Sequence, residues 1–234
     1  MATSGKDIVA LAKKHVGEKY VLGTLVPKDD KTWDGPWDCA EFASWLVYQK
    51  CEALYGCDRD SGPPSTADAC TSYWDRDSDI VGKIISIDNA AAIPGAFVLR
   101  VAVTNQCGHI VVSDGKGGTI EAANHIDGVI QSHLSGRRWD KGILVPGINY
   151  GTPTAGLPPL EVPVVYRLTS PPMQGAKIKE IQTQLTAKGF DTGGADGQFG
   201  PRTFVAVLQF QRAQGLVADG EVGPLTAKAL GVKL

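Results

Sequence analysis

The segment Trp37-Asp38-Cys39-Ala40-Glu41-Phe42-Ala43-Ser44-Trp45-Leu46-Val47-Tyr48 decides how the first half of the chain is interpreted. Apolar residues recur at helical spacing from Cys39 onward, and the residues before it are polar or rich in Gly and Pro. Cys39 is therefore predicted to lie at the N-terminus of a helix. This position favours the thiolate, because the helix dipole and the free N–H groups stabilise negative charge.

Three strands are predicted downstream of this helix. They cover Pro94–Val103, His109–Ser113 and Thr119–Asn124, with a Gly-rich turn before the third. Pairing of the last two strands around that turn is expected to bring Glu121 beside His109, because alternate residues share one face of a strand. A helical cysteine, a histidine on a strand and an acid on the next strand supply the nucleophile, base and orienting group of a thiol hydrolase.

The C-terminal 60 residues contain an internal repeat. The pattern D-G-x-x-G-P-x-T occurs at Asp196–Thr203 and again at Asp219–Thr226. Each copy joins Asp-Gly turn chemistry to a proline at the first position of a predicted helix. With the apolar stripes around it, the repeat predicts a small three-helix unit over residues 175–234.

A proline-rich segment separates this unit from the rest of the chain. Seven of the 14 prolines fall between positions 146 and 172. Proline favours extended backbone, so residues 150–174 are predicted to be a semi-rigid linker after a domain at residues 1–149. Val162–Leu168 is also compatible with an edge strand of that first domain.

Composition excludes several classes of protein. The net charge of −2 argues against binding to nucleic acid or to an anionic membrane surface, and no apolar run is long enough to span a membrane. The five cysteines form no CxxC pair and the four histidines show no ligand spacing, so no metal or other cofactor is expected. The disulfide state of Cys51, Cys57, Cys70 and Cys107 stays open, a Cys51–Cys57 bridge included.

The C-terminal unit is similar to the peptidoglycan-binding domain type 1 family, on Gln182-x-x-Leu185, the two D-G-x-x-G-P-x-T loops and Phe210-Gln211. This resemblance implies attachment to the bacterial cell wall. The exposed loop residues Gln198 and Arg202 are the candidates for wall contact.

Residues 5–148 resemble the NlpC/P60 family of papain-like cell-wall peptidases. The matching positions are Tyr20, Asp38-Cys39, Pro94-Gly95, Gly108-His109 and Ile120-Glu121-Ala122. The resemblance implies an α+β fold with N-terminal helices and an antiparallel sheet. It also implies Cys39 as nucleophile, His109 as base and Glu121 as the third catalytic residue, with Tyr20 and Asp38 near the substrate.

The chain departs from the family pattern in three places. Ala40-Glu41 follows the cysteine where Ser or Gly is usual, Ala96 replaces a common Asp, and Glu121 stands where His is common. Asn124 and His125 are therefore alternatives for the third catalytic position, and Asn124 is also a candidate substrate-binding residue.

The combination predicts an enzyme that cuts an amide bond of the peptidoglycan stem peptide while its C-terminal domain holds the wall, as in an endolysin or an antibacterial effector. The alternatives are a CHAP-like N-acetylmuramoyl-L-alanine amidase, an acyl transferase and a non-catalytic wall-binding protein. The expected partners are peptidoglycan and an immunity or delivery protein. No signal peptide is visible, so synthesis in the cytoplasm and release by lysis or a secretion machine onto the wall is expected.

Overall fold

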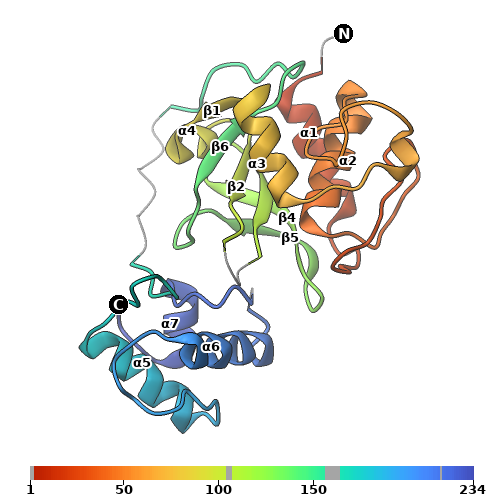
Figure 1. Cartoon of the computed structure of the whole chain (residues 1–234). Coiled ribbons are helices and arrows are strands. Elements are labelled where there is room, and N and C mark those ends of the chain that lie inside the picture. Colours follow the sequence, from red (N-terminus) through yellow and green to blue (C-terminus); the bar gives the residue numbers. More distant parts are fainter. Residues whose placement is uncertain (1–2, 104–106, 156–163, 217) are drawn as a thin grey trace. The chain divides into compact units, whose positions relative to one another are not determined.

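A computed structural model describes residues 3–103, 107–155, 164–216 and 218–234 (Figure 1). The chain divides into two compact units. Unit 1 comprises Met1–Leu134 and Trp139–Leu160, and unit 2 comprises Ser135–Arg138 and Glu161–Leu234. No helix in the described ranges is long and apolar enough to cross a membrane.

The helices of unit 1 precede most of its strands. The longest, α2, begins at Cys39 and ends at Cys51, as the apolar spacing predicts. The side chain of Asp38 accepts a hydrogen bond from the backbone N–H of Glu41 (2.9 Å) and so caps α2. The other helical segments are α1 (Gly5–Ala12), η1 (Lys13–His15), η2 (Pro64–Thr66), α3 (Thr71–Ile80) and α4 (Ile87–Ala91).

Unit 1 contains a six-stranded antiparallel sheet with the strand order β1-β6-β2-β3-β4-β5. The strands are β1 (Lys83–Ile85), β2 (Phe97–Arg100), β3 (His109–Ser113), β4 (Gly118–Asn124), β5 (Gly128–His133) and β6 (Lys141–Leu144). α2 packs against β3 and β4, and a buried core that includes Phe42, Leu46, Leu99 and Ile120 fills the space between helices and sheet. The helices and antiparallel strands agree with the predicted α+β fold.

β2 is shorter than the predicted strand. It spans four residues, whereas the prediction covered Pro94–Val103. The chain turns at Pro94-Gly95, where Gly95 has φ of +80° and donates its N–H to the carbonyl of Ser113. The pairing with β3 ends at Arg100, opposite His109.

A buried ion pair fastens two long loops to α2. Lys28 and Glu41 are both completely buried and joined by a short hydrogen bond. Lys28 also donates to the carbonyls of Val26 and Ala67, and Glu41 accepts from the N–H groups of Val26 and Ala69. Glu41, which departs from the family pattern, therefore holds both loops against α2.

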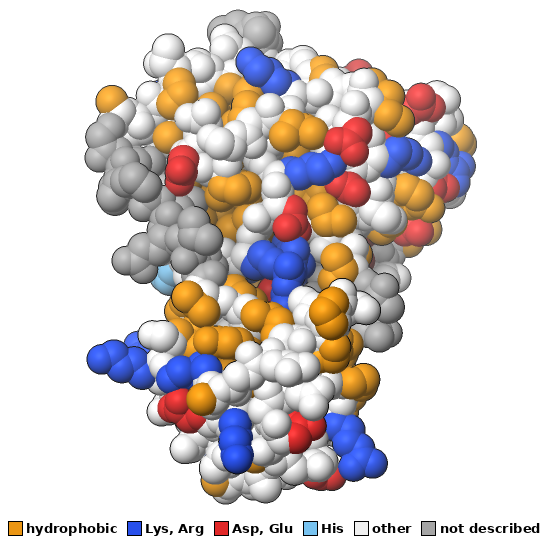
Figure 2. All heavy atoms as spheres, turned by 60° about the vertical axis from the view of Figure 1, so that its left-hand side comes forward, with side chains coloured by type: hydrophobic (Ala, Val, Ile, Leu, Met, Phe, Trp, Pro, Cys, Tyr) orange, Lys and Arg blue, Asp and Glu red, His pale blue; other side chains and the backbone are white. Residues whose placement is uncertain are grey.

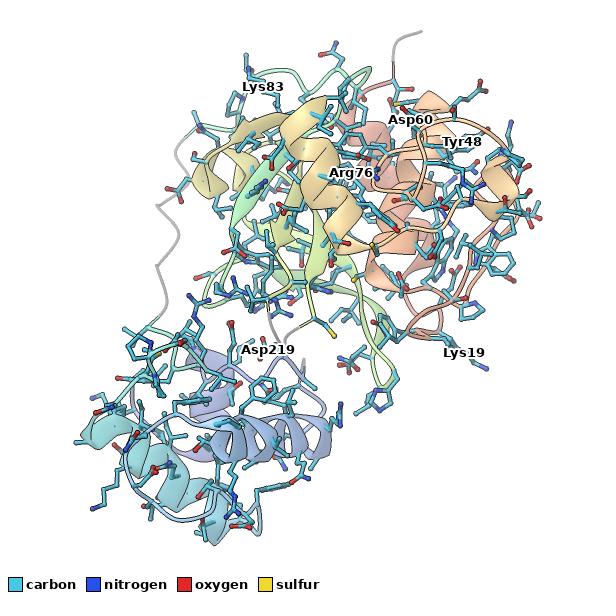
Figure 3. The ribbon with its side chains drawn as sticks, in the orientation of Figure 1. Lys19, Tyr48, Asp60, Arg76, Lys83 and Asp219 are labelled. Carbon is cyan, nitrogen blue, oxygen red and sulfur yellow. The ribbon has the colours of Figure 1, made fainter. Side chains whose placement is uncertain are left out.

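The loop before α3 is tied down at a second point. Arg76, labelled on α3 in Figure 3, binds Asp77 through Nε (2.7 Å) and donates to the carbonyl of Cys57 (2.7 Å). Asp77 accepts the N–H of Gly56 (2.8 Å). Gly56 has φ of +72° and lies against the Trp74 ring, where a Cβ would clash. The long loop is therefore a fixed wall of the domain.

Unit 2 is built from α5 (Ala176–Ala187), α6 (Pro201–Ala213) and α7 (Pro224–Leu230) around its own buried core. Two buried glutamines organise the repeated loops in the same way. Gln182 donates to Asp196, Thr203 and the carbonyl of Gln198, and accepts the N–H of Gly197. Gln211 makes the equivalent four hydrogen bonds in the second loop, to Asp219, Gly220, Glu221 and Thr226. The repeated Asp and Thr thus shape the loops.

The described parts of the predicted linker belong to both units. Thr154 donates its N–H to Ala92 of unit 1, while Tyr166 forms an antiparallel bridge with Val222 of unit 2. The idea that Val162–Leu168 forms an edge strand of the first domain is therefore wrong for residues 164–168. Residues 156–163 of the linker lie outside the described residues.

Charged side chains of both signs lie interspersed with apolar ones on the face shown in Figure 2. This agrees with the near-balanced count of 23 basic and 25 acidic residues.

Candidate active site

Cys39 occupies the first position of α2 and is 8% exposed. The backbone N–H groups of Ile110 and Ala40 lie near its thiol and act to lower its pKa. Ile110 follows His109 in β3, so the thiol lies at the point where α2 meets the start of that strand. The helix and the sheet, rather than a mobile loop, fix the position of the sulfur.

The surroundings of Cys39 favour the neutral thiol. Burial, followed by the adjacent Asp38 carboxylate, raises the pKa of Cys39 to about 12, against the pull of the Ile110 N–H and the Arg100 guanidinium. The Ala40 N–H at the helix N-terminus still lowers this pKa, but burial and Asp38 outweigh it, so the expected net preference for the thiolate is wrong for the resting site. A thiolate at Cys39 requires a partner that takes its proton.

His109 and Glu121 form a buried pair. Nε2 of His109 lies 2.6 Å from Oε2 of Glu121, and the two residues are 3% and 1% exposed. β4 pairs with β3 so that Ile120 faces Val112, which sets Glu121 diagonally across from His109. Because a carboxylate only accepts, Nε2 carries a hydrogen and Nδ1 is the nitrogen that can receive a proton.

Two residues that the sequence analysis did not single out support this pair. The hydroxyl of Thr119 donates to Oε1 of Glu121 (2.7 Å) in the buried interior. The Trp139 ring stacks on His109, with centroids 6.2 Å apart and planes 29° apart, and its Nε1 donates to the Leu134 carbonyl. Thr119 could have been found from its spacing, since it shares a strand face with Glu121; Trp139 has no such signal.

Cys39 opens onto a cavity of about 580 Å³ in unit 1. Asp38 is the acid among its lining residues, and most of the remaining lining is apolar or small. The lining residues are Leu22, Asp38, Cys39, Ala40, Ala69, Cys70, Thr71, Ala102, Val103, Cys107 and Gly108.

Asp38 lines the cavity, and Tyr20 lies near the start of α2. Burial raises the pKa of Tyr20, and Cys39, Asp38 and Cys107 act in the same direction when ionised. A backbone bridge between Tyr20 and Trp37 holds the tyrosine beside the start of α2. Asp38 accepts N–H groups from Glu41 and Gly23, and burial raises its pKa.

Asn124 is not brought to the cavity. Its amide donates to Asp127, and its oxygen accepts the N–H groups of Ile126 and Asp127, which closes the turn between β4 and β5. His125 is an exposed residue of the same turn. Of the three candidates for the third catalytic position, Glu121 is the residue that contacts His109.

The candidates for wall contact in unit 2 differ from each other. Gln198 is exposed, and its backbone is used by the Asp196 and Gln182 hydrogen bonds. Arg202 lines a surface cavity of about 480 Å³ with Asp191, Pro201, Val205 and Gln209. The Arg202 side chain packs against the α-carbon of Gly193. A Cβ at position 193 would lie 2.5 Å from Arg202 Cδ and would clash with it.

Within the part of the chain that the structure describes, no group of three or more His, Cys, Asp or Glu side chains is arranged to hold a metal ion.

Two solved structures are similar to parts of this chain. The NlpC/p60 domain of the peptidoglycan hydrolase SagA has a TM-score of 0.44 and 21% identity, and the match covers 61% of this chain and all of that one. NlpC2 from Trichomonas vaginalis has a TM-score of 0.43 and 17% identity over 64% of this chain and 48% of that one. Similarity this low does not identify the chemistry of unit 1, which has to be inferred from its own side chains.

Several curated proteins share a segment with this chain. A probable N-acetylmuramoyl-L-alanine amidase of Bacillus licheniformis is 47% identical over 60 residues, 25% of this chain and 17% of that protein. The amidase CwlM of Mycobacterium tuberculosis is 35% identical over 94 residues, 38% and 23% of the two chains. The zinc D-Ala-D-Ala carboxypeptidase of Streptomyces albus G is 51% identical over 49 residues, 19% of each. This chain thus spans less than a quarter of the length of each of these relatives.

The C-terminal repeat matches a protein-family model. Residues 174–230, which include all three helices of unit 2, match the family described as a putative peptidoglycan binding domain.

Proposed function

We propose that this protein is a peptidoglycan hydrolase that cleaves an amide bond of the stem peptide with Cys39 as its nucleophile. The observations that carry this proposal are the buried His109–Glu121 pair at 2.6 Å and the helix-terminal Cys39, which opens onto a cavity and lies near the N–H of Ile110, the residue after His109. A nucleophile, a base and a group that orients the base are the components of covalent acyl transfer. The match of unit 2 to a peptidoglycan binding family supports the wall as substrate.

The proposed reaction begins with proton transfer from the Cys39 thiol to Nδ1 of His109 as the sulfur attacks the scissile carbonyl. The pKa of about 12 at Cys39 means that thiolate and imidazolium form together. Glu121, which accepts from Nε2, stabilises the imidazolium. The imidazolium then protonates the leaving amine, and water hydrolyses the thioester with His109 again acting as base.

Groups around the thiol are suited to the substrate oxygen and amine. The N–H of Cys39 is the first of α2, and N–H groups at a helix N-terminus stabilise a developing oxyanion. The Tyr20 hydroxyl lies near the thiol and retains its proton, because burial raises its pKa. Asp38 caps the helix and faces the cavity, so we assign it both helix capping and contact with a substrate amine.

Unit 2 is proposed to hold the enzyme on the wall. Arg202 is the better candidate for direct contact, because it lines a cavity with one acidic and two apolar residues. Gln198 is the second candidate. A protein that acts in this way works on the cell wall, outside the cytoplasm.

The bond itself is tested by digestion of defined muropeptides and identification of the products by mass. Release of a shortened stem peptide supports the endopeptidase reaction, whereas release of an intact peptide from the muramoyl group identifies an amidase of the kind that the relatives' names describe. A product in which an added amine replaces water identifies acyl transfer.

The matched control is at the other end of the same helix. Cys39→Ala removes the proposed nucleophile, while Cys51→Ala removes the last thiol of α2, which is half-buried and outside the cavity. We expect Cys39→Ala to abolish cleavage and Cys51→Ala to retain it. A wild-type chain that binds wall but releases no product would support the non-catalytic alternative and contradict the proposal.

A further inference from the structure

Three of the five cysteines line the same cavity. Cys39, Cys70 and Cys107 all face it, and their exposure rises in that order from buried through half-buried to exposed. The other two cysteines lie elsewhere: Cys51 ends α2 and Cys57 is completely buried. The proposed nucleophile is therefore the least accessible thiol of a group of three.

A contact between the Gly108 backbone and the Thr71 side chain brings together the chain segments that carry Cys107 and Cys70. Gly108 lies directly on Thr71, so closely that a Cβ at position 108 would lie 2.2 Å from Thr71 Oγ1 and 2.6 Å from Thr71 Cβ. Cys107 and Cys70 immediately precede these two residues. Cys70 is the N-cap residue of α3, and its Sγ lies 2.9 Å from the Ser72 hydroxyl.

Cys107 and the proposed nucleophile Cys39 line the same cavity. An oxidant that attaches to Cys107 is thus held near the Cys39 thiol, where a second thiol can displace it. Cys70 and Cys39 are the two thiols of the cavity that can do so.

We propose that Cys107 and Cys70 form a disulfide when the protein meets a small-molecule disulfide, and that this reaction keeps Cys39 reduced. Formation of the Cys70–Cys107 disulfide does not depend on the proposed function of Cys39. The benefit of keeping Cys39 reduced does rest on that function. An enzyme that acts on the cell wall works where thiols are exposed to oxidants.

The reaction is a two-step exchange. The Cys107 thiolate attacks oxidised glutathione, forms a mixed disulfide and releases one glutathione thiolate. The Cys70 thiolate then attacks the Cys107 sulfur, forms the Cys70–Cys107 bond and releases the second glutathione. Two protein thiols lose two protons and two electrons, and one oxidised glutathione becomes two reduced molecules.

Access and ionisation direct the oxidant to Cys107. Thiol–disulfide exchange requires a thiolate that the oxidant can reach. Cys39 is 8% exposed, and burial and Asp38 hold its proton. Cys107 is exposed. Cys70 and Cys39 then compete to attack the mixed disulfide on Cys107. Cys70 is favoured, because the contact between Gly108 and Thr71 holds its chain segment against that of Cys107.

The test treats the reduced full chain with oxidised glutathione, blocks remaining thiols under denaturing conditions, and maps every cysteine by peptide mass. We expect a Cys70–Cys107 linked peptide and a free Cys39 in the wild type. In Cys70→Ser, the resolving thiol is absent, so we expect loss of free Cys39 to a Cys39–Cys107 bridge. In Cys107→Ser, Cys39 stays free and no bridge forms. Cys51→Ser is the control and should match the wild type.

Two outcomes would overturn the proposal. One is glutathione or a disulfide on Cys39 of the wild type, and the other is a free Cys39 in oxidised Cys70→Ser. These measurements need no wall turnover. A chain that forms the Cys70–Cys107 bridge but cleaves no peptidoglycan would keep this inference and contradict the proposed function.

Discussion

Glu121→Gln tests how the site controls the histidine tautomer. Glu121 accepts hydrogen bonds from Nε2 of His109 and from the Thr119 hydroxyl. A glutamine has one acceptor oxygen and one donor nitrogen at these positions. A hydroxyl can donate or accept; where the Thr119 hydroxyl keeps donating, as it does to the carboxylate, it holds the glutamine oxygen and the NH2 group faces His109. Nε2 must accept from that NH2, which moves the ring hydrogen to Nδ1 and prevents His109 from taking the Cys39 proton.

The loss has two parts. A hydrogen bond to a charged group contributes about 1.5–3 kcal/mol, so loss of imidazolium stabilisation alone reduces the rate roughly 10- to 100-fold. The wrong tautomer adds to this, and a carboxylate-to-amide change in a catalytic triad costs about 10⁴-fold in kcat. We therefore expect kcat of Glu121→Gln to fall by roughly 10³ to 10⁴.

A second substitution separates the two parts. In the double variant Thr119→Val/Glu121→Gln, the hydroxyl that fixes the amide is gone, so the amide can turn its oxygen to Nε2 and restore the tautomer. The assay is the initial rate of muropeptide cleavage, with thermal unfolding as a check of the fold. We expect the double variant to be faster than Glu121→Gln. A double variant that is no faster, or a Glu121→Gln enzyme within threefold of wild type, would refute the reasoning about the tautomer.

Three further predictions concern the framework. Glu41→Ala leaves Lys28 buried without its charge partner and should destabilise unit 1 by about 3–5 kcal/mol. Urea unfolding followed by tryptophan fluorescence measures this, since all five tryptophans lie in unit 1. The paired change Lys28→Met/Glu41→Leu should destabilise unit 1 less than Glu41→Ala. Gln182→Ala and Gln211→Ala each remove four hydrogen bonds and should each cost unit 2 about 2–4 kcal/mol, seen as faster hydrogen exchange in α5–α7 with unchanged tryptophan fluorescence; normal protection would contradict this role. The Gln198 N–H and the Gln182 side chain lower the pKa of Asp196 below 3.8 in the folded state. The ionised Asp196 therefore stabilises unit 2 above pH 3.8, and this stabilisation is lost as the pH falls through the lowered pKa of the folded state. Protection of unit 2 from hydrogen exchange should fall with acid less steeply in Asp196→Asn than in the wild type.

The sequence predicted the parts of the site that depend on local pattern. Helical spacing placed Cys39 at the start of α2, and strand alternation placed Glu121 on the face that His109 shares. Both follow from the regular geometry of helices and antiparallel strands. The repeated D-G-x-x-G-P-x-T loops likewise predicted three helices. The hydrogen bonds of these loops to Gln182 and Gln211 are visible only in the structure.

Other features depend on contacts between segments far apart in the chain. Lys28 and Glu41 look like surface charges in the sequence, yet they are completely buried against each other. Trp139 stacks on His109 from a segment with no motif. The sign of the Cys39 pKa shift was also missed, because a helix N-terminus is a local feature whereas burial depends on the packing of the whole domain.

The assignment of Asn124 shows the opposite error. An asparagine close to Glu121 in sequence was treated as a candidate for substrate contact, but its side chain closes the β4–β5 turn. Asparagine is common in turns for this reason. Proximity in sequence therefore favoured a residue that the strand carries away from the cavity.

The central claim is that the Cys39 sulfur attacks the wall. The most direct measurement is the release of new amino groups or muropeptides from insoluble peptidoglycan by the full chain, compared between wild type, Cys39→Ala and Cys51→Ala, with the amount of protein that pellets with the wall measured in each sample. We expect equal pelleting of all three proteins and release by wild type and Cys51→Ala alone. Release by Cys39→Ala at the wild-type rate would contradict it.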